Sequence, residues 1–107
     1  MIIRVNTFEL GTDKEAALKP LEEAAEIFGA WQTYKPYDIE PRSSADLDGQ
    51  SAFFWAKRKE ILRKMLALEI ADCITACCNL AARYDLDLES ALKEVEKRNR
   101  ERGRYGN

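Results

Sequence analysis

One stretch of the chain, residues 65–82 (MLALEIADCITACCNLAA), restricts the folds that it can adopt. It contains no Gly or Pro and is apolar nearly all round, which predicts a long buried helix. Burying an isolated carboxylate costs several kcal/mol, so acids on such a helix require a positive partner. We expect a metal ion to be that partner. At about 100° per residue, the strongly polar residues fall on one narrow stripe: Glu69, Asp72, Thr75 and Asn79.

A first helix is expected over about residues 13–33, because Thr12 and Glu15 have the spacing of a capping box. Pro20 would either kink this helix or begin a second segment. The helix is amphipathic, and we expect its apolar face to pack inward. That face contains Leu18, Leu21, Ala25, Phe28 and Gln32, with Ala24 and Trp31 beside it.

The remaining segments complete an all-α protein with three main helices. Residues 34–50 form a long loop with two prolines, two serines and a glycine. A second helical segment runs from near Ser51 to near Tyr84, either as one helix or as two with a slight break. Asp87 is the expected N-cap of a last helix that stops at Gly103. At the start of the chain, residues 1–5 (MIIRV) are either a short strand or an extended arm, and Gly11 marks a break.

Composition indicates a single domain, residues 1–107, of ordinary soluble type, with 46% hydrophobic and 34% charged residues. The net charge of −2 gives no sign of nucleic-acid or anionic-membrane binding. The apolar run around Cys73 is interrupted by two acids, and the start of the chain lacks a signal-peptide core. We therefore expect a cytoplasmic protein without a membrane segment. Its cysteines, Cys73, Cys77 and Cys78, are expected to be buried small hydrophobes in a reducing compartment.

Two pairs of acids carry the expected chemistry. Glu23 and Glu26 share one helix face, and Glu69 and Asp72 repeat the same i, i+3 spacing. If the two helices pack antiparallel, four carboxylates converge and repel one another unless cations bind or their pKa values rise. Oxygen ligands select Mg²⁺ or Mn²⁺, and a chain without histidine cannot supply the Glu-x-x-His pairs of a di-iron bundle. Glu22, about 100° from Glu23, points toward the site or to water. Taken alone, Glu22, Glu23 and Glu26 would also fit an ordinary solvent-exposed face of the first helix.

These residues resemble the all-alpha NTP pyrophosphohydrolase superfamily, which includes the MazG-like proteins, the dimeric dUTPases and the phosphoribosyl-ATP pyrophosphohydrolases. The resemblance covers roughly residues 18–34 and 60–104. It rests on Glu23-x-x-Glu26, on Glu69-x-x-Asp72 with Asn79 seven residues later, and on the ending LESALKEVEKRNRERGRY. It implies Mg²⁺ ligands at Glu23, Glu26, Glu69 and Asp72, and nucleotide contacts at Asn79, Lys97, Asn99 and Arg102. Glu22 is a candidate extra ligand or general base, and Trp31, otherwise a core residue, is a candidate for stacking on the base.

The sequence departs from the family pattern in two places. The connection between Glu26 and Glu69 is longer than usual, so residues 34–50 are an insertion in a single MazG-like helical domain, and substrate identity is left open. Val95 lies near the place of the family's lysine one turn before its Lys-Asn pair. The assignment of Lys93 or Lys97 therefore stays open.

The resemblance implies an Mg²⁺-dependent enzyme that converts a nucleoside triphosphate and water to a nucleoside monophosphate and pyrophosphate. A phosphoribosyl-ATP pyrophosphohydrolase-like enzyme is the near alternative. A non-catalytic helical interaction module, whose acid pairs bind partner arginines, is an alternative of a different class.

The predicted architecture is an antiparallel helical bundle completed by oligomerisation. The first and last helices can cover two sides of the helix that contains residues 65–82, but a helix apolar all round requires a third neighbour. We expect a second copy of the chain to supply it, in a homodimer or a homotetramer.

Overall fold

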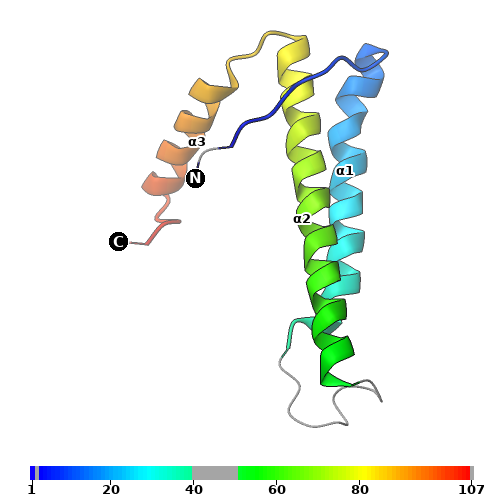
Figure 1. Ribbon diagram of the computed structural model, residues 1–107. Helices are drawn as coiled ribbons and strands as arrows, with labels where there is room; N and C mark the ends of the chain where they lie inside the picture. Colours follow the sequence, from blue (N-terminus) through cyan, green and yellow to red (C-terminus); the bar gives the residue numbers. More distant parts are fainter. Residues whose placement is uncertain (2, 40–50, 107) are drawn as a thin grey trace.

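The computed structural model describes residues 1, 3–39 and 51–106. These residues form three α-helices and one short 3-10 helix (Figure 1): α1 (Asp13–Tyr34), η1 (Lys35–Tyr37), α2 (Ala52–Arg83) and α3 (Leu88–Glu101). The described residues contain no strand, so the all-α prediction is confirmed. The helix α1 continues through Pro20, and α2 is one unbroken helix.

The predicted helix starts are also confirmed. In each case the N-cap side-chain oxygen accepts a hydrogen bond from the backbone N–H three residues further on, which satisfies one of the free donors of the first turn. The acceptors are Thr12 for Glu15 (3.1 Å), Ser51 for Phe54 (3.2 Å) and Asp87 for Ser90 (3.0 Å).

The predicted loop over residues 34–50 is too long at its start. Tyr34 is the last residue of α1, and residues 35–37 continue as a 3-10 turn, in which Pro36 lies at the start with its backbone φ already suited to a helix. Most of the predicted insertion, residues 40–50, lies outside the described part of the chain.

The helices α1 and α2 lie side by side and antiparallel (Figure 1). The residues that each helix turns toward the other recur at alternating steps of three and four, which is the spacing of a coiled-coil seam. On α1 they are Ala16, Pro20, Glu23, Ile27, Ala30 and Tyr34, and on α2 they are Trp55, Lys59, Leu62, Leu66, Glu69, Cys73 and Ala76. Glu23 and Glu69 thus occupy positions that apolar side chains normally fill.

The predicted inward face of α1 is wrong. Leu21 and Phe28 are 69% and 58% exposed, and Trp31 stacks on Phe28 at the surface, with ring centroids 5.6 Å apart. Ala16 and Ala30 are small, so the two helices can approach closely along their seam of facing residues. The larger apolar side chains of Leu21 and Phe28 lie beside this seam. The side of α2 turned away from α1 is exposed as well, including Leu68, Ile70 and the free thiol of Cys77.

The last helix does not cover α2, contrary to the prediction. After α2 the chain turns at Asp85, whose φ is 51°, and α3 projects away from both other helices (Figure 1). The apolar residues Leu92 and Val95 of α3 are exposed. The radius of gyration is 18.6 Å, against about 13 Å for a compact domain of this length. The described part of one chain is therefore a helical hairpin with a projecting third helix.

A polar bridge joins the two helices at the loop end of the hairpin. Tyr34 is buried there, and its hydroxyl accepts a hydrogen bond from Nη1 of Arg63 (2.8 Å) and donates one to Oδ1 of Asp38 (2.7 Å). That hydrogen bond, followed by the charge of Lys35, lowers the pKa of Asp38. Tyr34 thus fixes the pairing of α1 and α2 at this end.

The first residues of the chain form an extended arm, which was one of the two predicted alternatives. The arm, residues 3–11, crosses α2 and leads into α1 (Figure 1). Arg83, at the end of α2, donates hydrogen bonds to the carbonyls of Leu10 (2.6 Å) and Gly11 (3.4 Å), and its Nε lies 2.7 Å from Oδ1 of Asp13. The arm is therefore attached to the end of the hairpin.

Within the described residues, α2 is the one helix long and apolar enough to cross a membrane, with a mean hydropathy of 1.5 over its most apolar 18 residues. The core helix of a soluble protein meets the same condition, so this is weak evidence for a membrane. The expected cytoplasmic location stays a prediction.

Candidate metal centre

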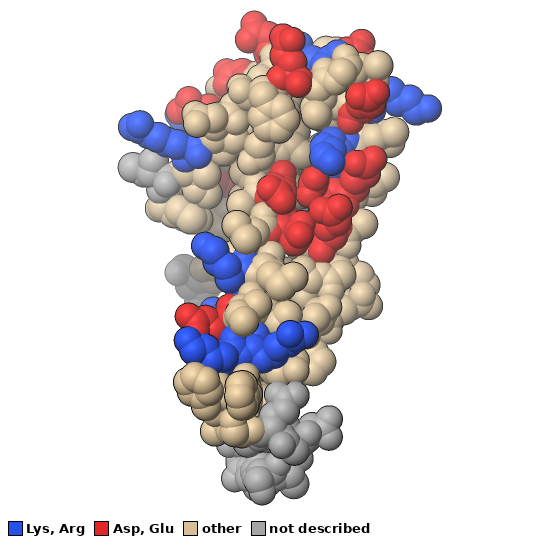
Figure 2. All heavy atoms as spheres, turned by 45° about the vertical axis from the view of Figure 1, so that its right-hand side comes forward, with Lys and Arg blue, Asp and Glu red and all other residues tan. Residues whose placement is uncertain are grey.

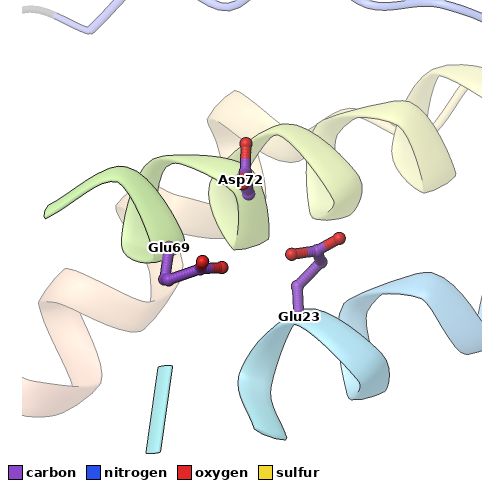
Figure 3. Close-up of side chains that lie close together, drawn as sticks. All are labelled: Glu23, Glu69 and Asp72. Atoms are coloured by element: carbon purple, nitrogen blue, oxygen red, sulfur yellow. The ribbon is translucent and has the colours of Figure 1, made fainter. Parts of the chain in front are cut away.

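Three acids from two helices meet near the middle of the hairpin (Figure 3). Glu23 on α1 faces Glu69 and Asp72 on α2, and one carboxylate oxygen of each lies within 4.8 Å of the others. The antiparallel pairing and the two i, i+3 spacings produce this meeting. We call these three residues the acid cluster; on one face of the molecule, acidic side chains gather over the hairpin (Figure 2).

Two carboxylate oxygens of the acid cluster are buried without a partner. Glu23 is only 7% exposed, and its Oε2 has no hydrogen-bond partner among the described residues; the same holds for Oε2 of Glu69. The other oxygen of Glu23, Oε1, lies 3.3 Å from Nζ of Lys19. Lys19 also pairs with Glu22, so its ammonium group is shared between two carboxylates. A buried anion without a partner is unstable unless a cation or a proton joins it.

Glu26 lies beside the acid cluster, at its exposed edge. A hydrogen bond shared with Glu23 and the negative charge of Glu23, together with smaller effects of Glu69, raise the pKa of Glu26. A carboxyl group so close to two others is harder to ionise. Glu26 therefore interacts electrostatically with Glu23 and Glu69 from outside the acid cluster.

Glu22 stands apart from the acid cluster. Its side chain is mostly exposed and pairs with Lys19, with 3.6 Å between Oε2 and Nζ. Of the two orientations left open by the sequence, the structure shows the one toward water. Lys19 is a residue that sequence reasoning missed, although its place four residues before Glu23 on one helix face is a signal for an ion pair.

The donor set fits a hard divalent cation. Its ligands are carboxylate oxygens alone, which suit Mg²⁺ or Mn²⁺. A cation would bind first to the two carboxylate oxygens that have no partner among the described residues, Oε2 of Glu23 and Oε2 of Glu69. The three free thiols are not members of the group within 4.8 Å.

A hollow opens on each side of the acid cluster along the groove between α1 and α2. One, of about 280 Å³, has Glu26 and Glu69 in its wall and continues toward Leu62 and Thr33. The other, of about 220 Å³, has Glu23 and Asp72 in its wall and continues toward the N-terminal arm. A ligand held at the acids thus has room in both directions.

The other predicted nucleotide contacts are not gathered at this place. Asn79 is 4% exposed and lines the second hollow, but its Oδ1 accepts the backbone N–H of Phe8 (2.8 Å). Trp31 is 42% exposed and lines neither hollow. Three further predicted contacts lie on or just after the projecting helix α3, away from the acids of their own chain: Lys97, Asn99 and Arg102.

Comparison with known proteins adds no relative, because no family model, curated protein or solved structure matches the chain. The resemblance to the all-alpha NTP pyrophosphohydrolases stays a prediction from the residues. A function for this chain therefore has to be inferred from the geometry of the acid cluster together with that resemblance.

Proposed function

We propose that this protein is a Mg²⁺-dependent nucleoside triphosphate pyrophosphohydrolase. One observation supports this most: Glu23 and Glu69 of the acid cluster each have a buried carboxylate oxygen that no described residue contacts by a hydrogen bond. An arrangement that is unfavourable without a cation and open to solvent on both sides is suited to binding a metal together with a phosphate ligand. The resemblance in Glu23-x-x-Glu26 and Glu69-x-x-Asp72 supplies the reaction type.

The proposed reaction is a hydrolysis at the α-phosphorus. The oxygen of a water molecule bonds to the α-phosphorus, and the bond from that phosphorus to the α–β bridging oxygen breaks, with its electron pair passing to pyrophosphate. One of the two water protons passes to pyrophosphate and the other to solvent. The products are a nucleoside monophosphate and pyrophosphate. When bound, Mg²⁺ would neutralise phosphate charge and lower the pKa of the attacking water. Glu23, Glu69 and Asp72 would hold it from both helices, and Lys19 would neutralise phosphate oxygens beside them.

The proposed enzyme is a dimer. Leu21 and Phe28 of α1 and Ile70 of α2 leave the hairpin with exposed apolar side chains that no described part of the chain covers. A two-fold partner would bury them. The dimer would also let Lys97, Asn99 and Arg102 on one chain serve the acid cluster of the other, as the resemblance implies.

Adding Mg²⁺ is expected to raise the melting temperature of the wild-type protein, because a ligand that binds only the folded state stabilises it. At a concentration 100 times the dissociation constant the gain is about 2.7 kcal/mol. Thermal unfolding with MgCl₂, MnCl₂ and NaCl at matched ionic strength measures it. Asp72→Asn should lose the gain and Glu60→Gln, the matched change elsewhere on α2, should keep it; equal shifts in all three proteins would contradict a site at the acid cluster.

The activity itself is tested by pyrophosphate release from a panel of canonical and modified (d)NTPs with Mg²⁺. Equimolar monophosphate and pyrophosphate are expected, and EDTA should abolish both. Phosphoribosyl-ATP belongs in the same panel, since turnover of that compound alone would move the assignment to the neighbouring activity. No pyrophosphate from any substrate would overturn the proposed function.

A further inference from the structure

Part of the wall of the second hollow beside the acid cluster comes from the N-terminal arm. The hollow is lined by Lys19, Glu23, Asp72 and Asn79 of the hairpin and by Phe8 and Leu10 of the arm. A triphosphate bound at the acids could therefore extend along this hollow toward the arm. The arm residues Phe8 and Leu10 are the apolar part of that path.

The arm is held in place at two points. The buried side chain of Asn79 accepts the backbone N–H of Phe8 (2.8 Å), and Arg83 holds the carbonyls of Leu10 and Gly11. A buried amide and a partly buried guanidinium group that bind backbone atoms in this way hold the backbone in one position. Phe8 is therefore fixed at its backbone, next to the hollow.

The Phe8 side chain is nevertheless 59% exposed. A phenyl ring that stays this exposed on a fixed backbone gains little from folding alone, since large aromatic side chains normally stabilise a fold by burial. An exposed ring on a fixed backbone is a suitable surface for a flat aromatic ligand, and bases stack on such rings in a sequence-tolerant way.

We propose that Phe8 is the surface on which the nucleobase stacks, and that Asn79 is a positioning residue that acts through the Phe8 backbone. The inference rests on the proposed function and deepens it: the substrate is a nucleotide whose base lies against the N-terminal arm and whose phosphates lie at the acid cluster. Trp31, the base-stacking candidate from the sequence, does not line this hollow.

Phe8→Ala is expected to raise KM for nucleoside triphosphates about 10-fold, the loss of one base–aromatic stack, and to change kcat much less. Phe8→Tyr, which keeps an aromatic ring, should have the KM of the wild type. Inorganic tripolyphosphate, which has no base, should inhibit the wild type and Phe8→Ala with the same inhibition constant. Phe53→Ala serves as the matched control, because Phe53 is 66% exposed at the opposite end of α2.

Asn79→Ala should raise KM to a similar degree, and the double variant Phe8→Ala/Asn79→Ala should add little to either single one, because both changes remove the same contact. An unchanged KM in an active Phe8→Ala protein would overturn this inference and leave the proposed function standing. An equal rise in the tripolyphosphate inhibition constant would also overturn it, since the arm would then serve the metal site and not the base. Absence of hydrolysis by the wild type would overturn the proposed function and this inference with it.

Discussion

Glu69→Gln and Asp72→Asn should each lower metal-dependent pyrophosphate release on the order of 100-fold or more, since even the loss of a group behind a ligand costs about 10–100-fold. Both carboxylates belong to the acid cluster, and an amide is a weaker ligand for Mg²⁺. Steady-state kinetics with saturating Mg²⁺ and nucleotide measure the loss. Glu60→Gln, an exposed acid on the same helix, should retain wild-type turnover.

The same two variants should melt at the wild-type temperature or above it when no metal is present. Each removes a negative charge from a crowded group in which one oxygen of Glu69 has no hydrogen-bond partner in the described part of the chain. Lost activity with retained stability is the signature of a functional acid. Wild-type turnover in both variants would eliminate the metal site, and lost stability in both would show that these acids serve the fold.

The second large effect concerns assembly. Light scattering at micromolar concentration should give the mass of a dimer or a larger closed oligomer for the wild type. It should give the mass of a monomer for the double variant Leu21→Lys/Phe28→Lys. Burying each of these side chains contributes about 1.5–3 kcal/mol, and a two-fold interface contains each twice. The loss of about 6 kcal/mol or more corresponds to roughly four orders of magnitude in the dissociation constant.

Ile3→Lys is the control for this experiment, because Ile3 is an exposed apolar residue of the arm, outside the proposed interface. It should leave the oligomer intact. The monomeric variant should also lose hydrolysis, since Lys97 and Arg102 would no longer reach a second chain. A wild type that is a cooperatively folded monomer would refute the dimer, and full activity in a monomeric variant would refute the shared site.

Local signals in the sequence were sufficient for the helices and for the meeting of the acids. The caps at Thr12, Ser51 and Asp87 depend on neighbours within one turn, and the i, i+3 spacing of Glu69 and Asp72 fixes their common face. The composition also limited the ligand set, because a chain without histidine leaves only oxygen and thiol donors.

Local signals did not encode which face of α1 packs inward, where the N-terminal arm binds or where α3 points. Two stripes on α1 have helical spacing, and the larger side chains of Leu21 and Phe28 drew the prediction to the outer one. The inner stripe is a mixture of small, charged and aromatic residues, which hydrophobicity alone does not select. The contact of Asn79 with Phe8 joins residues 71 apart, and the direction of α3 depends on a single turn at Asp85.

The seam between α1 and α2 has a consequence for how this chain tolerates changes in length. Glu23 must face Glu69 while Tyr34, eleven residues later, must meet Arg63. A single-residue insertion between Glu23 and Tyr34 would turn the later part of α1 by about 100°, so that one of these meetings is lost. Seven inserted residues would return Tyr34 to within about 20° of its original direction. Natural or designed variants of this hairpin that keep Glu23 near Glu69 and Tyr34 bonded to Arg63 should therefore differ in length by whole heptads, with the same number added to both helices.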